Sequence, residues 1–370
     1  MLRSRVATEF FLYVGPSRPV PLTRDVLRTL VSIEISEDVD QGTAFQLLFR
    51  MHQKDRTDFD LLRSQVMQPF YRCQLFVGLG ANTQLLLDGV ITHQEIVVSA
   101  QPGTTDLVVM GRDLSVMLDL EEKRAIFKNQ KDSAIAQVVL GGYGDLLPSS
   151  TVVETRDSAD ATYFSRHQLG TDLALLRELA ARNDYIFYLD ASRGGTQAYF
   201  GPEGRTDAGL PALTVNLGPA TNVKSLRASY NAFQPAEAQV EYFDFGKRQP
   251  VSLTMTQASR AALGSNPVVA RRRLLESSTV IDSNERANVT VQAAVDQAAN
   301  ALSLDGRLDT QDYGALLRPN YLIGVRGLGQ SFDGQYYVRR VQHHVERANC
   351  TQSFSLSRES TGNAVSRFTP

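Results

Sequence analysis

The chain has 370 residues, with 38 Lys and Arg against 40 Asp and Glu, a formal net charge of -2. At roughly 150 residues per domain, this length predicts two or three domains with buried cores. The near-neutral balance excludes a chain-wide electrostatic footprint for nucleic acid, and 42% hydrophobic residues exclude global disorder. No apolar run approaches the roughly 18 residues of a membrane-spanning helix, and the N-terminus lacks a secretory pattern. We therefore expect synthesis in the cytoplasm without membrane insertion.

Short strands separated by turns are predicted from about residue 31 to 113. Residues 31–35 alternate apolar and polar side chains, as a half-buried strand does. Gly78-Leu79-Gly80 and Asp88-Gly89 are typical of turns. Further strands are expected at 44–50, 74–77, 90–98 and 106–112. This spacing predicts a small barrel or sandwich.

The pattern changes near residue 114 to a mixed α/β region that reaches about residue 220. A helix over 133–140 is expected to end at Gly141-Gly142. A second helix begins at Thr171-Asp172, with an apolar face made of Leu173, Leu176, Leu179 and Ala180. An aromatic strand over 185–189 follows.

Strand signals return in the last third of the chain, at 238–243, 321–325, 335–345 and 353–357. A helix capped by Ser283 or Asn284 is predicted among them. The domain boundaries follow from these changes. We place a first β-barrel domain at 1–118, a mixed α/β domain at 119–225, a second β-barrel domain with a helix near 284–303 at 226–360, and a loose tail at 361–370.

Two segments of the chain resemble each other in order and spacing. Asp88-Gly89 precedes Thr105 by 17 residues, counted from the Asp, and Asp333-Gly334 precedes Thr351 by 18. The first segment also holds Gly78-Leu79-Gly80, His93 and Arg112, and the second holds Gly327-Leu328-Gly329, His343 and Arg358. The repeat predicts two similar β domains on either side of the mixed segment.

Chemical motifs are weak throughout. His343 and His344 are neighbours in a predicted strand, so they point to opposite faces and do not share one metal ion. Cys73 and Cys350 are predicted to be unpaired thiols, with a single bridge as the alternative. The basic run at 271–273 is typical of a solvated or subunit-facing loop, and contact with phosphates is the other reading. We name no catalytic, cofactor-binding or metal-ligating residue, and we expect no cofactor.

Three stretches together resemble the phage late control protein D family, the central baseplate hub of contractile tails. The hub portion of VgrG in type VI secretion and in extracellular contractile injection systems is similar. The stretches are 73–80 continuing through Asp88-Gly89-Val90-Ile91-Thr92 to 109–113, then 171–182 with the 185–189 strand, and 332–338 with His343 or His344 closing on 353–358. They occur in the family's order over about residues 10 to 360.

The resemblance implies a β-rich α+β fold with two tube-protein-like β-barrels per chain, and a homotrimer that presents six barrels in a ring. The ring would match a threefold spike protein to the sixfold inner tube or its initiator, beside other baseplate proteins, and nucleate the tube. A structural role of this kind implies no enzyme activity and no sequence-specific nucleic acid. The sequence departs from VgrG in stopping near Pro370, so the spike is expected as a separate chain. Asp88, Gly89, Asp333 and Gly334 are predicted as turns that matter for assembly.

Two other functions stay open at this stage. One is a tail-associated cell-wall hydrolase, for which the cysteines give no support. The other is a receptor- or polysaccharide-binding module of the same particle, for which Tyr336-Tyr337 is the candidate aromatic platform. The sequence does not distinguish a phage tail from a secretion machine or a released injection particle, and it does not identify a cargo.

Overall fold

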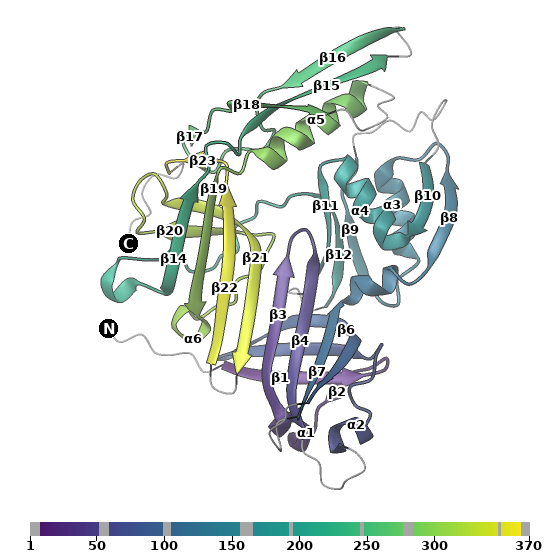
Figure 1. Ribbon diagram of the computed structural model, residues 1–370, viewed down its shortest axis with the longest axis vertical. Helices are drawn as coiled ribbons and strands as arrows, with labels where there is room; N and C mark the ends of the chain where they lie inside the picture. Colours follow the sequence, from purple (N-terminus) through teal and green to yellow (C-terminus); the bar gives the residue numbers. More distant parts are fainter. Residues whose placement is uncertain are drawn as a thin grey trace.

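The computed structural model describes residues 8–51, 59–98, 105–155, 166–191, 195–244, 248–276, 284–346 and 349–363. Strands dominate this part of the chain, and the helices are few and short (Figure 1). The predicted β-rich α+β fold is confirmed. None of the helices in these ranges is long and apolar enough to cross a membrane.

The first six-stranded unit is formed by the N-terminal part of the chain. Its strands lie side by side in the order β3-β4-β7-β6-β5-β1, and the short β2 continues from β1. The unit also contains the helices α1 (Arg24–Thr29) and α2 (Asp60–Arg63). The strands are β1 (Thr8–Gly15), β2 (Val20–Pro21), β3 (Leu30–Asp38), β4 (Gly42–Met51), β5 (Arg72–Leu79), β6 (Asn82–Val97) and β7 (Thr105–Asp113).

Alternation of burial shows why these segments are strands. In β4 every second side chain is buried, namely Phe45, Leu47, Phe49 and Met51. Successive side chains of a strand point to opposite faces, so this period of two places one face in the core. The expected strands at 31–35, 44–50, 74–77, 90–98 and 106–112 all lie within or overlap strands of this unit.

The second six-stranded unit repeats this arrangement near the C-terminus. Its strands lie in the order β14-β19-β22-β21-β20-β13. When the strands of each unit are numbered along the chain, without the short β2, both units have the same spatial order. The second strand is followed by the third, sixth, fifth, fourth and first. The first strand differs, because β1 is antiparallel to β5 whereas β13 is parallel to β20. The strands are β13 (Leu213–Thr214), β14 (Val223–Tyr230), β19 (Leu302–Asp309), β20 (Leu322–Arg326), β21 (Gly334–Glu346) and β22 (Asn349–Arg358), with α6 (Thr310–Tyr313) placed as α2 is.

Local irregularities recur at equivalent points of the two units. An extra residue, Thr92, interrupts the pairing of β6 with β7, and Arg339 interrupts the pairing of β21 with β22. In the same way Val31 interrupts β3 against β4, and Lys224 interrupts β14 against β19. Bulges of this kind redirect a strand and re-aim its side chains. Their recurrence fixes which residues of the two units are equivalent.

A backbone hydrogen bond next to each of the bulges at Thr92 and Arg339 agrees with this alignment. The Phe70 N–H donates to the Ile91 carbonyl at 2.7 Å, and the Asn320 N–H donates to the Val338 carbonyl at 3.1 Å. Phe70 and Asn320 also share a left-handed backbone, with φ of 64° and 69°. The internal repeat is thus present in the fold as two units of the same strand order.

The residues that the sequence repeat had matched are nevertheless not equivalent in space. With Thr92 opposite Arg339 in the alignment, His93 corresponds to Arg340, and His343 corresponds to Ile96. The short motifs therefore detected the duplication but in a register shifted by up to three residues.

The two units are joined edge to edge. Residues 340–346 of β21 pair antiparallel with residues 32–38 of β3, with Arg340 opposite Asp38. This pairing makes one sheet of 13 strands out of regions that the sequence suggested as separate domains. The first unit's core accordingly includes Leu316, Val345 and Cys350 from the second unit.

A mixed α/β segment lies between the units in sequence and packs beside the first one (Figure 1). The predicted helices are present, and the Thr171 hydroxyl accepts from the Ala174 N–H at 3.2 Å as the N-cap of α4. The predicted apolar face of α4 is buried. The elements are η1 (Leu114–Leu118), β8 (Glu122–Phe127), α3 (Asp132–Gly141), β9 (Ser149–Val152), β10 (Arg166–Thr171), α4 (Asp172–Arg182), β11 (Tyr185–Asp190) and β12 (Gln197–Pro202). The short helix η2 (Gly218–Ala220) lies between β13 and β14 of the second unit.

An inserted subdomain separates β14 from β19. It comprises β15 (Ala236–Asp244), β16 (Gln249–Met255), β18 (Arg272–Glu276) and α5 (Asn284–Ala298), which share a core of their own. In the first unit the same place is a tight turn between β3 and β4. In Figure 1 the subdomain lies at the end of the molecule opposite α2.

Two sequence predictions in this region are wrong. The helix near 284–303 ends at Ala298, because residues from Leu302 onward pair with β14 and β22 as a strand. The tail predicted as loose begins inside β23 (Ser360–Thr361), which pairs with β17 (Asn266–Pro267). The alternative cap Ser283 and residues 364–370 lie outside the described residues.

Candidate functional site

Asp88 and Gly89, predicted to form an assembly turn, lie inside a continuous strand. Gln74 and Cys73 of β5 are opposite them in the ladder, so the predicted turn is wrong. The turn between β5 and β6 falls earlier, at Gly80, whose φ is 61°. An Asp-Gly pair resembles a turn in sequence, but here each residue has a separate packing role.

Asp88 is a buried anchor between the first unit and the mixed segment. Its side chain is 1% exposed and accepts from Arg72 Nε at 2.7 Å and Nη2 at 2.6 Å. The Thr196 hydroxyl, from the mixed segment, donates to it at 2.6 Å. This bidentate contact with Asp88 raises the pKa of the Arg72 guanidinium. The Asp88 carboxylate therefore links two parts of the chain through Arg72 and Thr196.

Gly89 is required by a close approach of two strands. A Cβ added there would lie 2.3 Å from the Arg112 carbonyl oxygen and 3.1 Å from the Phe45 ring. Side chains do not approach backbone so closely, so only glycine fits this place in β6. Its role is to allow strand packing and not to reverse the chain.

Asp333 and Gly334 do lie at a chain reversal, where β20 leads into β21. The Asp333 carboxylate accepts from the Leu328 N–H at 2.8 Å, and Gly334 has a φ of 138°. Arg358, which is fully buried, donates to the Asp333 and Ser331 carbonyls at 3.1 and 2.9 Å. Its guanidinium also lies 4.5 Å from the centre of the Tyr336 ring. A role for this turn in assembly stays a prediction.

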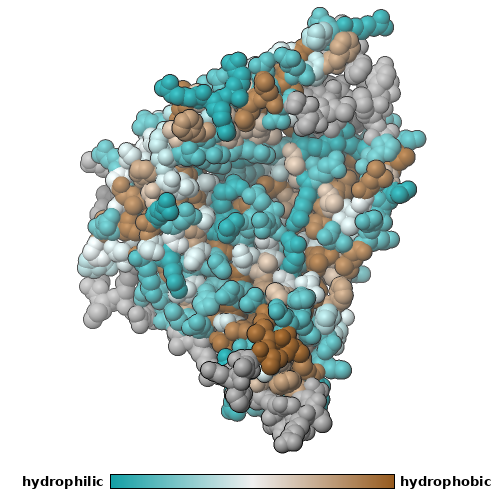
Figure 2. Space-filling view, viewed as in Figure 1, coloured by the Kyte–Doolittle hydropathy of each residue, from teal (hydrophilic) through white to brown (hydrophobic). Residues whose placement is uncertain are grey.

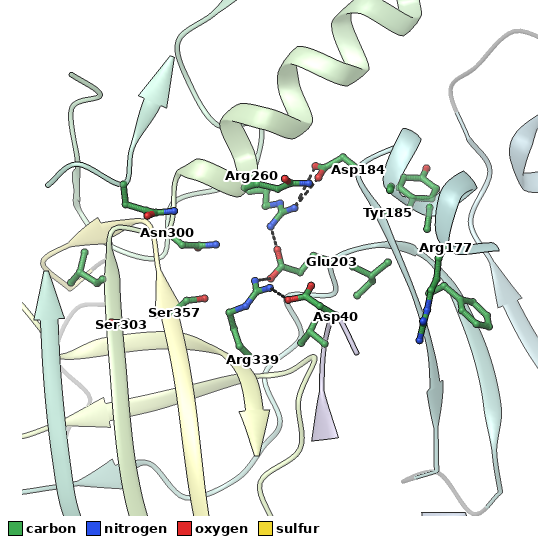
Figure 3. A pocket seen from close by; sticks show the side chains of 18 residues that line it. Asp40, Arg177, Asp184, Tyr185, Glu203, Arg260, Asn300, Ser303, Arg339 and Ser357 are labelled. Atoms are coloured by element: carbon green, nitrogen blue, oxygen red, sulfur yellow. Dashed lines mark hydrogen bonds and ion pairs between the residues drawn. The ribbon is translucent and has the colours of Figure 1, made fainter. Parts of the chain in front are cut away.

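Among the described residues, a pocket of about 700 Å³ with charged side chains in its wall lies where the sheet, the mixed segment and the inserted subdomain meet. Figure 3 shows its charged side chains converging from all three parts. Figure 2 shows that hydrophilic residues dominate the middle of this face, whereas apolar residues gather over the first unit.

Alternating charges line this junction pocket. Arg260, from the inserted subdomain, contacts both Glu203 and Asp184 of the mixed segment, the latter at 3.2 Å. Arg339, at the bulge of β21, lies 4.0 Å from Glu203 and 2.9 Å from Asp40. The bulge thus aims Arg339 into the pocket. These five residues connect all the parts that meet there.

One carboxyl of the pocket has a strongly shifted titration. Burial raises the pKa of Asp184 to about 7, Arg260 opposes that rise, and the neighbouring Asp296 carboxyl adds to it. Asp296 is itself buried and accepts from the Ser259 N–H and hydroxyl at 2.7 and 2.6 Å. Two carboxyls close together favour a proton on one of them.

The ion pairs of the pocket hold different parts of the chain together. Asp40, Asp184 and Glu203, the carboxylates that line it, each lie within an ion pair with an arginine. Sequence reasoning missed this cluster, because its members are separated by tens to hundreds of residues and carry no local motif. In the described ranges no group of three or more His, Cys, Asp or Glu side chains is arranged to hold a metal ion.

The remaining sequence candidates have packing roles. His343 is fully buried and lies 2.9 Å from Glu37, whereas His344 is on the partly exposed face. Tyr336 and Tyr337 are 0% and 1% exposed, so the proposed aromatic platform is wrong. These two neighbouring side chains point to opposite faces of β21, and both are buried because this part of the strand is covered on both faces.

Both cysteines are free thiols in the core, and burial raises the pKa of each. Of the basic run, Arg272 and Arg273 lie on β18, and Arg273 is 3.1 Å from Glu237. That run therefore belongs to an exposed face of the inserted subdomain.

Comparison with solved structures identifies the fold as that of phage and secretion-system tail proteins. The tail protein of Neisseria meningitidis MC58 matches with a TM-score of 0.64 at 12% identity, over 95% of this chain and 97% of that one. The 43 kDa tail protein of prophage MuSo2 from Shewanella oneidensis matches with a TM-score of 0.64 at 16% identity, over 95% and 99%. A chain of the Francisella PdpA-VgrG complex matches with a TM-score of 0.55 at 10% identity, over all of this chain and 55% of that one.

The resemblance inferred from the sequence is thereby confirmed for the fold. Within this class, the two tail proteins are matched along nearly their whole length. No curated protein matches by sequence. The family profile of the Alg8 N-terminal domain matches residues 25–162. That range is less than half of the chain, begins in α1 and ends inside the mixed segment, so it does not coincide with a structural unit.

Proposed function

We propose that this chain is a structural baseplate hub of a phage tail or contractile injection particle. Three copies form a ring in which each copy contributes two equivalent six-stranded units. Such a ring has threefold symmetry for a spike protein on one side. On the other side it offers six similar units to the sixfold inner tube or to the initiator of that tube, and so nucleates tube assembly. Other baseplate proteins surround the ring.

The observation that carries this proposal is the internal duplication. Two units with one strand order and two pairs of equivalent bulges stand edge to edge in one sheet. Closed rings arise from head-to-tail contacts repeated by rotation. A chain that already contains one such contact between its own halves needs a second, similar contact between copies to close a ring. The fold likeness to tail proteins supports the same role.

The contacts between the parts of each copy suit a static component. Asp88 anchors the mixed segment, and the junction pocket holds the inserted subdomain through arginine-carboxylate pairs. We infer that the first unit, the mixed segment, the second unit and its inserted subdomain move together as one body. The particle itself would be assembled from chains made in the cytoplasm.

Light scattering on the purified full chain, across concentration and with its spike protein, tests the proposal. The expected result is a stable species with three copies of the 40.8 kDa chain, either alone or with the mass of the spike added. A monomer under both conditions would overturn it.

A further inference from the structure

One edge of β21 is shared by two partners in succession. Residues 334–337 of β21 pair with β20, and residues 340–346, beyond the Arg339 bulge, pair with β3. The second pairing covers the side chains of His343 and Val345, which are 0% and 4% exposed. This edge-to-edge contact is what joins the two units of one chain.

The equivalent strand of the first unit, β6, has only the first of these partners among the described residues. Residues 82–90 pair with β5, and beyond the Thr92 bulge residues 93–97 pair with β7 on the other edge. Exposed apolar side chains lie there among polar ones. Ile96 is 47% exposed and Val98 is 72% exposed, although their equivalents are the buried His343 and Val345.

The strand β14 also has one edge without a strand partner among the described residues. It is the terminal strand of the sheet and, in the described ranges, pairs with β19 alone. Its equivalent, β3, buries Ile33 and Ile35 to 2% and 0% exposure against β21 and the core. In β14 the corresponding Leu226 and Ala228 are more exposed. An unpaired strand edge is a template for pairing with another chain.

We propose that residues 94–98 of one copy pair antiparallel with residues 226–230 of the next copy. Transferring the in-chain register of β21 and β3 through the bulge equivalences places Ile96 opposite Ala228 and Val97 opposite Arg227. Val98 is then opposite Leu226. The partner at this edge of β6 is a second copy of this chain, because β3 of the other unit covers the equivalent edge of β21 in the same way.

Side-chain chemistry agrees with that register. Glu95 falls diagonal to Arg227 on the outer face, within reach of an ion pair. In the equivalent in-chain contact, His344 lies 3.2 Å from Glu34 on the same face. Phe70 is 59% exposed beside β6, whereas its equivalent Asn320 is buried at the junction of the two units. The contact is head-to-tail, so repeated copies close into a ring.

This inference rests on the proposed function, and a register-specific disulfide tests it separately. Val97→Cys and Arg227→Cys are combined in one full-length chain, which is oxidised together with its spike protein. The native cysteines are buried and do not compete. The matched control combines Val97→Cys with Ala228→Cys, which shifts the register by one residue and places the second thiol on the other face.

The expected product is a covalent trimer in denaturing gels without reductant, at least ten times more abundant than in the control. Mixing the two single variants should give covalent dimers only. A trimer by light scattering with no disulfide, or with equal disulfide in the control, overturns this pairing and leaves the hub in place. An intramolecular disulfide also overturns it. Absence of any association overturns both proposals.

A charge substitution gives a second, independent readout. Ile96→Lys should weaken association of copies at least tenfold, because it places an ammonium group at the paired edge. Ile126→Lys is the matched control, since Ile126 is a strand isoleucine of similar exposure, 57%, in β8. Circular dichroism confirms that both variants fold. Equal association of the two variants would contradict the pairing.

Discussion

Replacing Asp88 with alanine should destabilise the link between the first unit and the mixed segment. The substitution removes the acceptor of two Arg72 donors and of the Thr196 hydroxyl. Removing one partner of a buried ion pair costs about 3 to 5 kcal/mol. Because the Arg72 side chain is 25% exposed and regains water, we expect the lower end, about 3 kcal/mol.

Two further variants separate the contributions of charge and hydrogen bonding. Thr196→Val removes one hydroxyl donor and should cost about 1 kcal/mol. Asp25→Ala is the control for an exposed ion pair, because Asp25 and Arg28 are 91% and 78% exposed. Such pairs contribute about 0.5 kcal/mol or less. The expected order of destabilisation is therefore Asp88→Ala, then Thr196→Val, then Asp25→Ala.

Urea unfolding followed by far-UV circular dichroism and tyrosine fluorescence measures these costs, since the chain has no Trp. The comparison uses the first transition, because a chain of several parts need not unfold in one step. If Asp88→Ala and Asp25→Ala lowered the free energy of unfolding equally, Asp88 would not anchor the mixed segment to the first unit.

Three other outcomes are expected. Gly89→Ala should cost about 1 to 3 kcal/mol, because its Cβ would meet the Arg112 carbonyl, and an unchanged melting temperature would contradict this. Gly334→Ala should cost a similar amount, about 1 to 3 kcal/mol, from its positive φ and from contact with Arg358, measured in the same way. Because the folded chain holds a proton on Asp184 up to pH about 7, stability should fall as pH rises from about 4 to 7; Asp184→Asn should remove that part of the slope, and parallel pH profiles of melting temperature would refute it.

Local patterns predicted the elements well where the period and the caps agree. The helix α4 was predicted from its Thr171 cap and its apolar face, and both are found. The strand positions followed from alternation and from the glycines between them. The duplication was also visible, because two units of one strand order place glycines and apolar runs at similar intervals.

Long-range contacts account for the failures. The pairing of β3 with β21 joins residues about 300 positions apart, and neither strand shows in its own sequence which edge it meets. Gly89 was taken for a turn residue because glycine serves both turns and close strand contacts. The arginines of the junction pocket have carboxylate partners in other parts of the chain, so no spacing rule reveals them.

We propose that each chain supplies two equivalent units to a threefold ring. Electron cryo-microscopy of the chain bound to its spike and inner-tube subunits tests it most directly. We expect three copies around the axis, and six similar sheet units in the layer that faces the tube, with β6 of each copy next to β14 of its neighbour. A ring with another number of copies, or tube subunits contacting only one unit of each chain, would contradict it.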